Sequence, residues 1–285
     1  MSDRALRSPE ELLADLADVI LPLGKIAVAS SGGVDSTVLV VAAAHILGPD
    51  NVLAVTALAP MVPGDDQEDA SRVAGLAQVR HLTARLPESI LDLPPFAKNP
   101  PDRCYHCKKI LFDALLALAH GAGFNVLCDG TNRDDLKDYR PGLRALEELK
   151  VMSPLAGAGF SKAEVRALAA QICPDFAAKP AMACLATRIP THTPVTLAAL
   201  KRIDTAETLL RQKGLGQVRV RDHAGLARVE LEPAFLEKGL APDWIVLVRD
   251  CLLEAGFAFA TLDLQGYRTG SMNPAANLTR QEGFS

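Results

Sequence analysis

The stretch SSGGVDS (residues 30–36) decides the fold, because it joins two apolar segments of different periodicity. Before it, residues 25–30 form a short apolar run typical of a buried strand. After it, residues 35–47 have the pattern of a helix that stops at Gly48-Pro49. Gly32 and Gly33 lie where a chain turning from strand to helix must approach a ligand closely. The stretch therefore predicts a phosphate-binding loop.

Phosphate oxygens suit this loop because the free N–H groups and the dipole of the helix start attract anions. Ser31 and Ser36 add hydroxyl donors, and Asp35 is a candidate Mg²⁺ ligand or helix cap. The lysine of the common nucleoside-triphosphatase loop is missing, and Lys162, at the start of a later helix, is the best replacement. The plainer alternatives are a tight strand–helix turn and a surface lysine.

Strands and helices alternate over the first part of the chain. Further strands are expected at 51–57, 79–84 and 125–129, and helices at 9–21, 65–78 and 102–120. This alternation predicts an α/β fold with a doubly wound parallel sheet. After residue 178 the expected order is a helix at 196–213, strands at 217–222 and 226–231, a helix at 243–254 and a strand at 259–264. We therefore expect two domains, 1–178 and a smaller α+β domain, 179–285.

Composition limits the classes of function. The 285 residues carry a formal net charge of −4, so no broad basic surface is expected and nucleic acid is not an expected partner. The sequence has no apolar run long enough for a membrane span, and its acidic amphipathic start is unlike a signal peptide. Six cysteines are too few for a disulfide scaffold at this length, which favours reduced thiols in the cytoplasm.

Three cysteines are candidates for chemistry. Cys104 and Cys107 lie three residues apart at a predicted helix start, on one face, where the helix dipole and Arg103 favour thiolates. Cys184 lies in the proline-flanked loop KPAMACLATRIP, with Arg188 nearby. A zinc site would need two more ligands, and a redox CxxC would follow a strand. The alternative for each is a small buried residue, which is the expectation for Cys128, Cys173 and Cys251.

A second cluster of charge lies in the predicted strands 217–222 and 226–231. Arg219 and Arg221 share one strand face, as do Arg228 and Glu230. If Ala224-Gly225 forms a two-residue turn, Arg221 faces Arg228 and Arg219 faces Glu230. Opposed like charges need a bridging anion, and guanidinium groups suit phosphate and carboxylate. The alternative is a solvated strand face with ordinary salt bridges.

Weaker candidates surround these sites. Arg188 and Tyr267-Arg268 are possible additions to the arginine cluster, whereas Glu207 is expected to be an exposed helical glutamate. Residues 129–132 follow a predicted strand, and ligands bind at such strand ends in open α/β sheets. Asp134, Asp135 and Asp138 are candidate Mg²⁺ ligands or simply solvated loop residues.

The motif SGGxDS resembles the pyrophosphatase loop of the N-type ATP pyrophosphatases, the PP-loop enzymes. Most of the chain resembles one family among them, the LarE family of ATP-dependent sulfur transferases, which build the nickel-pincer nucleotide of lactate racemase. The resemblance rests on the ordered motifs SGGVDS, RCYHCK, DGTNRDDLKDYRPGLRA, SPL followed by SK (residues 153–155 and 161–162), KPAMACLATRIP, VRVRDH with ARVE, and GYRTGSMN.

This resemblance implies a reaction and a set of cofactors. ATP, with Mg²⁺, adenylylates a carboxylate of pyridinium-3,5-biscarboxylic acid mononucleotide and releases pyrophosphate. An enzyme sulfur then attacks the acyl-AMP, and a thiocarboxylate forms. In one form of the family the cysteine matching Cys184 gives up its own sulfur. In another, three cysteines hold a [4Fe-4S] cluster, and Cys104, Cys107 and Cys184 give that count. The cluster is therefore the expectation, and the family also implies a homo-oligomer.

Two other readings of the motifs stay open. A tRNA-thiolating enzyme of the same superfamily also combines SGGxDS with CxxC, but the net charge of −4 disfavours an RNA-binding surface. A nucleotide sensor would bind ATP without chemistry and would release no pyrophosphate. Amide-forming relatives would not require the cysteines.

Overall fold

The computed structural model describes residues 7–137, 141–180 and 183–268. The chain divides into two compact units, Met1–Pro87 with Asp102–Met182 and Glu88–Pro101 with Ala183–Ser285. The sequence predicts a single domain boundary after residue 178. In the structure the boundary follows residue 182, and the inserted segment 88–101 belongs to the second unit.

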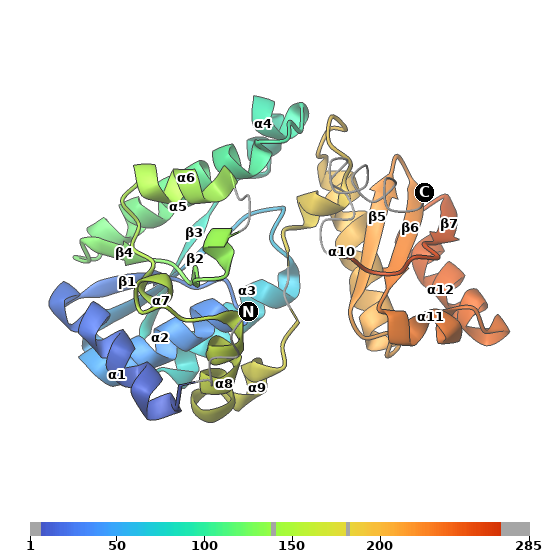
Figure 1. Cartoon of the computed structure of the whole chain (residues 1–285). Coiled ribbons are helices and arrows are strands. Elements are labelled where there is room, and N and C mark those ends of the chain that lie inside the picture. Colours follow the sequence, from blue (N-terminus) through green and yellow to red (C-terminus); the bar gives the residue numbers. More distant parts are fainter. Residues whose placement is uncertain (1–6, 138–140, 181–182, 269–285) are drawn as a thin grey trace, which may run out of the picture. The chain divides into compact units, whose positions relative to one another are not determined.

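The first unit is built on a four-stranded parallel sheet (Figure 1). Its strand order is β3-β2-β1-β4, with all three pairings parallel. The strands are β1 (Ile26–Ala29), β2 (Val52–Leu58), β3 (Arg80–Arg85) and β4 (Val126–Cys128). The chain moves outward from β1 in one direction to β3 and then returns to place β4 on the other side. The predicted doubly wound sheet is confirmed, and the space between the carboxyl ends of β1 and β4 is the switch point where such sheets bind ligands.

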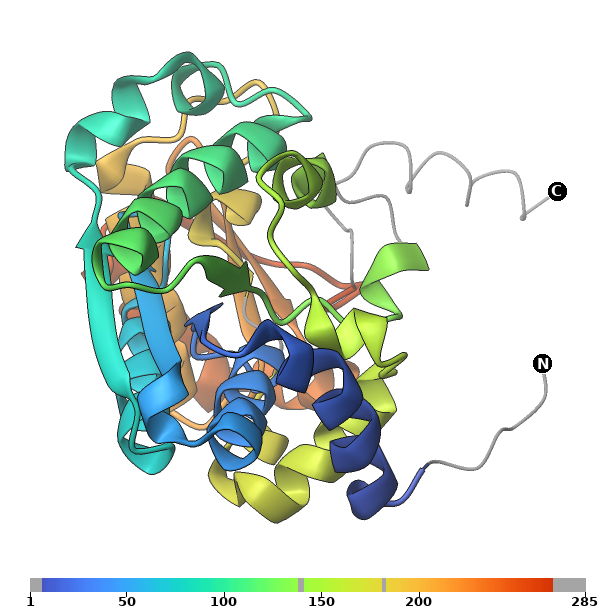
Figure 2. The same ribbon diagram turned by 90° about the vertical axis from the view of Figure 1, so that its left-hand side faces the viewer.

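Helices cover both faces of this sheet, as Figures 1 and 2 show. Ile26 and Val28 pack into one apolar cluster and Ala27 into the other, because successive side chains of a strand point to opposite faces. The first cluster includes α1 (Pro9–Ile20), α2 (Val34–Leu47), α3 (Gly64–Leu76), α8 (Lys162–Ile172) and α9 (Pro174–Ala177). The second includes α5 (Arg103–Gly121) and α6 (Pro141–Glu148). The short helix α7 spans Pro154–Gly157.

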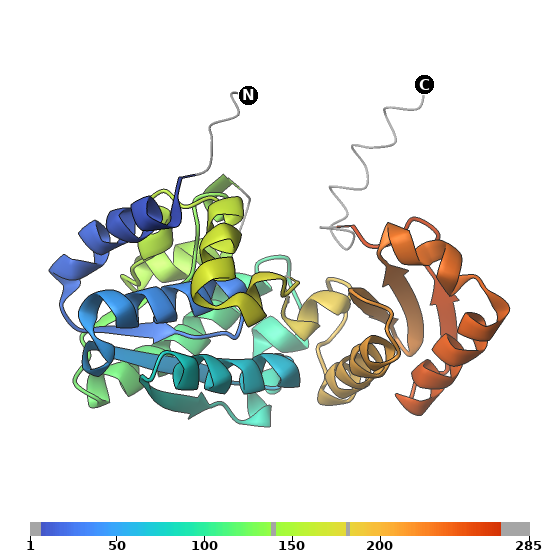
Figure 3. The ribbon, with the colours of Figure 1, turned by 90° about the horizontal axis from the view of Figure 1, so that it is seen from below.

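The second unit holds a three-stranded mixed sheet in the order β5-β6-β7 (Figure 3). Strands β5 (Val218–His223) and β6 (Leu226–Leu231) are antiparallel, whereas β7 (Phe259–Leu262) is parallel to β6. Helix α10 (Leu197–Gln212) contacts β5, and α12 (Pro242–Glu254) contacts both β7 and α10. The remaining helices are α4 (Pro94–Ala97) and α11 (Pro233–Gly239). The predicted α+β character is confirmed.

Short 3₁₀ turns complete the fold at Leu21–Leu23, Pro49–Asn51, Glu88–Asp92, Asp135–Lys137 and Leu185–Arg188. Within the portion of the chain that the structure describes, no helix is both long enough and apolar enough to cross a bilayer.

Candidate functional site

The SGGVDS loop connects β1 to α2 and packs tightly against the start of α3. Gly32 has φ +73°, and a Cβ there would collide with the carbonyl oxygen of Asp66. Gly33 is the N-cap of α2 and supplies no side-chain cap to the first helical N–H groups. The backbone therefore follows a path that needs glycine, and it ends at a helix start suited to an anion.

The two loop hydroxyls lie next to each other. Ser31 Oγ and Ser36 Oγ are 3.1 Å apart, and Ser36 Oγ donates to the Gly33 carbonyl at 3.0 Å. The Ser31 N–H donates to Ser36 Oγ at 3.2 Å. The structure thus brings the predicted donors together within one turn.

Asp35 connects the loop to two later segments. Its carboxylate accepts a hydrogen bond from Asn132 Nδ2 at 3.1 Å and forms an ion pair with Lys162 Nζ. Lys162 starts α8, where Ser161 and Glu164 form a capping box. The lysine proposed from the sequence as the replacement is therefore at the loop rather than on a remote surface.

The side chains of the acidic loop after β4 hydrogen-bond to backbone N–H groups of this loop and of α8. Asp134 accepts the Lys162 N–H at 2.8 Å, and Asp135 accepts the Asn132 N–H at 3.1 Å. Asp138 lies outside the described residues. These contacts fix the loop beside the glycine loop, and a role in binding Mg²⁺ stays a prediction.

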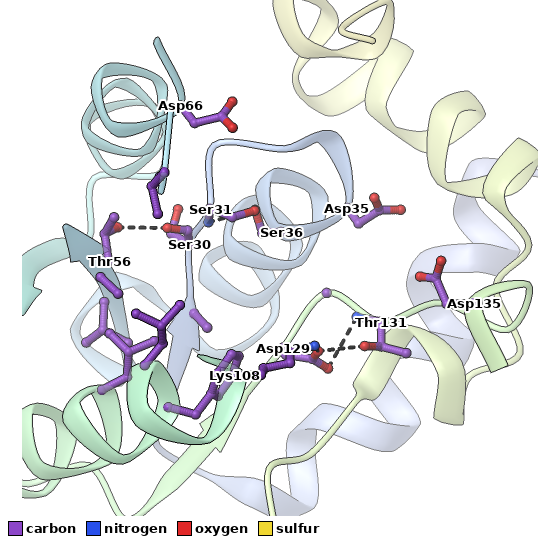
Figure 4. Close-up of a pocket in the computed structure, with 18 residues that line it drawn as sticks. Ser30, Ser31, Asp35, Ser36, Thr56, Asp66, Lys108, Asp129, Thr131 and Asp135 are labelled. Atoms are coloured by element: carbon purple, nitrogen blue, oxygen red, sulfur yellow. Dashed lines mark hydrogen bonds and ion pairs between the residues drawn. The ribbon is translucent and has the colours of Figure 1, made fainter. Parts of the chain in front are cut away.

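A cavity of about 290 Å³ opens beside the glycine loop (Figure 4). Its polar wall includes Ser31, Asp35, Ser36, Asp66, Lys108, Asp129, Gly130, Thr131 and Asp135. Its apolar wall includes Val55, Ala57, Val62, Leu111, Phe112 and Leu115. The cavity therefore has an apolar side from β2 and α5 and a charged side at the start of α2.

Asp129 organises the floor of this cavity. It accepts hydrogen bonds from Thr131 Oγ1 and Ser153 Oγ, each at 2.6 Å, and Lys108 Nζ lies 3.6 Å away. Figure 4 shows Lys108 and Asp129 next to each other. A Cβ on Gly130 would lie 2.7 Å from the Ser36 nitrogen, so the β4 loop also packs directly on the start of α2.

The candidate sulfur residues are divided between the two units. Cys104 is exposed and Cys107 half-buried on the first turns of α5, and Arg103 Nη2 lies 3.9 Å from Cys104 Sγ. Cys184 is half-buried at the N-cap of the turn Leu185–Arg188 in the second unit. Among the residues the structure describes, no three His, Cys, Asp or Glu side chains group as a metal site. Thiolates are the usual ligands of iron–sulfur clusters, and the cluster at Cys104, Cys107 and Cys184 stays a prediction.

The other three cysteines are buried, as expected. They are Cys128, Cys173 and Cys251. Burial raises the pKa of the Cys128 thiol to about 12 and that of Cys173 to about 11. Both thiols therefore stay protonated at neutral pH, as small apolar side chains would require.

The expectation that Glu207 is an exposed helical glutamate is wrong. Its side chain is 1% exposed and pairs with Arg188, which is 0% exposed, while its Oε1 also accepts the Val220 N–H at 3.0 Å. The reason is the orientation of α10, which turns Ile203, Ala206 and Glu207 together toward the sheet. A helical glutamate on such a face is buried only because it has partners.

Arg188 also holds the backbone next to the candidate nucleophile. Its Nη1 donates to the carbonyls of Ala183 at 2.6 Å and Cys184 at 3.2 Å. Arg221 Nη1 donates to the Thr187 carbonyl at 3.2 Å. The turn that carries Cys184 is thus bound to the arginines of the same unit.

The predicted hairpin register is confirmed. Ala224 (φ 55°) and Gly225 (φ 92°) form the turn, and Arg221 opposes Arg228 while Arg219 opposes Glu230. The bridging anion, however, is the protein's own Glu230, which accepts from Arg221 at 2.6 Å and from Arg228 at 3.1 Å. The alternative of a solvated face with salt bridges is half right: Arg221 and Arg228 do form ion pairs with Glu230, but Arg219, Arg221 and Glu230 are buried rather than solvated.

Arg219 has a different environment from its neighbours. Its Nη1 donates to the Val218 carbonyl at 3.0 Å, and its guanidinium lies over the Tyr267 ring, 5.4 Å from the centroid. Burial, and next the positive charge of Arg188, lower the pKa of Arg219. Tyr267 is a weak candidate from the sequence, and the structure places it against this arginine.

Sequence reasoning gave no ligand-site role to three residues. Lys108 and Asp66 line the cavity, and Lys179 contacts the glycine loop. Lys108 follows Cys104 by one helical turn, so the spacing could have placed it on the same face. Lys179 begins the KPAMACLATRIP motif, which could have marked it, whereas Asp66 carries no comparable pattern in the sequence.

These features define the class of the protein: a doubly wound α/β protein of the PP-loop fold, with a glycine loop between β1 and α2 and a smaller α+β unit. No protein-family model matches the chain. Over 266 residues it is 35% identical to the pyridinium-3,5-bisthiocarboxylic acid mononucleotide synthase of Lactiplantibacillus plantarum, covering 91% of this chain and 93% of that protein. The chain therefore belongs to the LarE family.

Two uncharacterized proteins show the same similarity. One, from a Synechocystis strain, is 38% identical over 264 residues, which is 93% of this chain and 97% of that protein. The other, from Methanocaldococcus jannaschii, is 32% identical over 208 residues, which is 73% of this chain and 78% of that protein.

Proposed function

We propose that the chain inserts sulfur into pyridinium-3,5-biscarboxylic acid mononucleotide, in two steps that use ATP. The name of the Lactiplantibacillus plantarum relative supports the product class. The observation that carries the proposal is the attachment of the Cys184 turn to buried arginines in one unit, through Arg188 and Arg221. A cysteine on a turn whose backbone is held by guanidinium groups suits a substrate that carries a phosphate and carboxylates.

The arginines of the second unit also suit an anionic substrate. Arg188, Arg219, Arg221 and Arg228 lie among the carboxylates of Glu207, Glu230 and Asp263. Guanidinium groups bind phosphate and carboxylate oxygens in a two-point geometry. A phosphate or carboxylate of the substrate would add to these contacts.

The first step is adenylylation of a substrate carboxylate. The cavity of the first unit suits ATP, with its apolar wall against the base and its polar wall at the phosphates. The N–H groups at the start of α2, with Ser31 and Ser36, would hold the leaving pyrophosphate, and Lys162 would neutralise its charge. Carboxylate oxygen is a poor leaving group, whereas AMP is a good one, so this step prepares the second.

Mg²⁺ fits this cavity as the cation that would bind together with the phosphates of ATP. Four carboxylates, Asp35, Asp66, Asp129 and Asp135, line the cavity, and an anionic ligand needs a cation to lie among them. Mg²⁺ is usually bound by one or two carboxylates together with substrate phosphates. Asp35 and Asp135 are the candidate Mg²⁺ ligands, since Asp35 belongs to the glycine loop and Asp135 to the loop after β4.

In the second step a sulfur attacks the acyl-AMP carbon, the carbon–oxygen bond to AMP breaks, and AMP leaves with the electron pair. Cys184 is the candidate nucleophile, and Arg188 holds its backbone. Attack by Cys184 gives a thioester; loss of the cysteine α-proton and cleavage of the Cβ–Sγ bond would then release the thiocarboxylate and leave dehydroalanine. A bound [4Fe-4S] cluster, with Cys104, Cys107 and Cys184 as ligands, would supply sulfide in place of the sulfur of Cys184 itself.

Incubation with ATP and the pyridinium mononucleotide tests the proposal. Pyrophosphate and a product in which sulfur replaces a carboxylate oxygen are expected, and neither should form when the mononucleotide is omitted. Pyrophosphate release that requires tRNA instead of the mononucleotide would favour a tRNA-thiolating enzyme. Nucleotide binding without pyrophosphate release would favour a nucleotide sensor. Intact protein mass then separates the sulfur sources: loss of one H₂S indicates sacrifice of Cys184, whereas unchanged mass with an iron absorbance that Cys104→Ala removes indicates the cluster.

A further inference from the structure

Lys179, the first residue of the KPAMACLATRIP motif, contacts the glycine loop. Its Nζ lies 2.8 Å from the Gly32 carbonyl oxygen, 2.8 Å from Asp66 Oδ1 and 2.6 Å from Asp69 Oδ2. An ammonium group has three N–H donors, and these three oxygens satisfy all of them. The side chain is 14% exposed, so this is a largely buried attachment.

The backbone around Lys179 is fixed from a second direction. Residues 177–180, which we call the strap, leave α9 and lead toward the second unit. Arg166 of α8 donates from Nη1 to the Ala177 carbonyl at 2.6 Å and from Nη2 to the Lys179 carbonyl at 3.1 Å. The strap is therefore held between α8 on its backbone side and the glycine loop on its side-chain side.

The loop end of this attachment lies at the proposed phosphate site. Gly32 packs directly against the Asp66 backbone, with no room for a side chain, and its carbonyl accepts from Lys179. A shift of this carbonyl when an anion binds is therefore expected to change the Lys179 contact. Asp66 lines the cavity as well, and burial raises the pKa of its carboxyl while Lys179 lowers it. An anion entering the loop thus changes the charge balance that holds Lys179.

We infer that Lys179 is a positioning residue that couples occupation of the glycine loop to the chain segment carrying Cys184, which follows it by five residues. The inference rests on the proposed function, because it assumes that a nucleotide binds the loop and that Cys184 is the sulfur residue. The chemistry gives a reason for such coupling: the sulfur is useful only after the carboxylate has been activated, and pyrophosphate in the loop marks that state.

The test uses protein prepared without iron, so that no cluster occupies Cys184. It measures the alkylation rate of Cys184 by iodoacetamide, followed by peptide mass spectrometry, with and without saturating Mg²⁺ and α,β-methylene-ATP. Nucleotide should change this rate several-fold in the wild type and in Lys179→Arg, which keeps the cation. In Lys179→Met the change should shrink to less than ~1.5-fold, while nucleotide affinity stays within about 3-fold, because the ammonium's donors are already occupied by protein oxygens. Lys25→Met, at an exposed lysine before β1, is the matched control and should behave as the wild type.

Asp69→Asn provides a second variant in case Lys179→Met folds poorly, since it weakens one of the three contacts without altering the strap. It should reduce the nucleotide-dependent change partially. An undiminished change in Lys179→Met or in Asp69→Asn, or nucleotide binding to the wild type with no change at Cys184, would overturn the inference alone. Absence of nucleotide binding to the wild type would overturn the inference together with the proposed function.

Discussion

Arg188 and Glu207 form a two-point ion pair inside the second unit, with Nε–Oε1 and Nη2–Oε2 distances of 2.9 Å each. Both side chains are almost completely buried, at 0% and 1% exposure. The same arginine binds the Ala183 and Cys184 carbonyls, so the pair connects α10 to the turn of the candidate nucleophile. Its integrity therefore bears on both the stability of the unit and the position of Cys184.

Glu207→Ala should lower the free energy of unfolding of the second unit by about 3–5 kcal/mol, because it leaves the Arg188 charge buried without its carboxylate. Urea unfolding followed by circular dichroism measures this change. Glu254→Ala, at an exposed glutamate ending α12, is the control and should change stability by less than about 0.5 kcal/mol. Equal stability of the two variants would show that the pair contributes little.

Arg219→Met should weaken binding of the pyridinium mononucleotide by roughly 10- to 100-fold, the loss expected for a charge-assisted contact to phosphate or carboxylate. ATP binding should be unaffected, because Arg219 belongs to the second unit and the cavity to the first. Calorimetric titration with each ligand makes the comparison. Arg249→Met, at an exposed arginine of α12 paired with Asp250, should bind both ligands normally. Unchanged mononucleotide affinity in Arg219→Met would remove this residue from the site.

Features set by neighbouring residues could be predicted from the sequence. The SGGVDS loop needs only an adjacent strand and helix, and the pairing of Arg221 with Arg228 follows from the turn at Ala224-Gly225. Lys162 could be located because a helix start is itself a local signal, given by Ser161. These contacts depend on backbone geometry over a few residues.

Features that depend on how distant segments pack could not be predicted. Lys179 contacts residues 113 and 147 positions away in the chain, from a segment without periodicity. Glutamate is a residue type that usually faces solvent on a helix. Only the orientation of α10 against β5 buries Glu207 and makes it a partner of Arg188. The pattern also leaves open which anion bridges Arg221 and Arg228, since the register assigns Glu230 to Arg219.

Two glycines with similar φ allow the effect of positive φ to be separated from the effect of loop packing. Gly32 (φ +73°) abuts α3, whereas a Cβ added to Gly24 (φ +70°) would meet no atom within 4 Å. Both alanine substitutions should lose roughly 1–3 kcal/mol of stability from the positive φ. Gly32→Ala should in addition reduce substrate-dependent pyrophosphate release by at least ~10-fold, because the displaced loop misplaces its N–H groups. Comparable release by the two variants would argue against the loop as the pyrophosphate site.

Glu164 should give the first unit a stability that is lost in acid. Its hydrogen bond from Arg7, 2.8 Å long, is the main cause that lowers the pKa of this carboxyl from 4.5 to about 2. Because the folded pKa is the lower one, the stabilisation is complete above about pH 4.5 and is lost as the pH falls toward about 2. By linkage it amounts to about 3 kcal/mol at neutral pH.

Thermal unfolding of the wild type and of Glu164→Gln between about pH 3 and about pH 7 tests this dependence. The difference in Tm should be largest near neutrality and should shrink as the pH falls, since protonation removes in the wild type the charge that the variant already lacks. Glu147→Gln, at an exposed glutamate of α6, should show no such trend. A Tm difference that stays constant across the range would mean that packing or the capping box, rather than the charge of Glu164, accounts for its contribution.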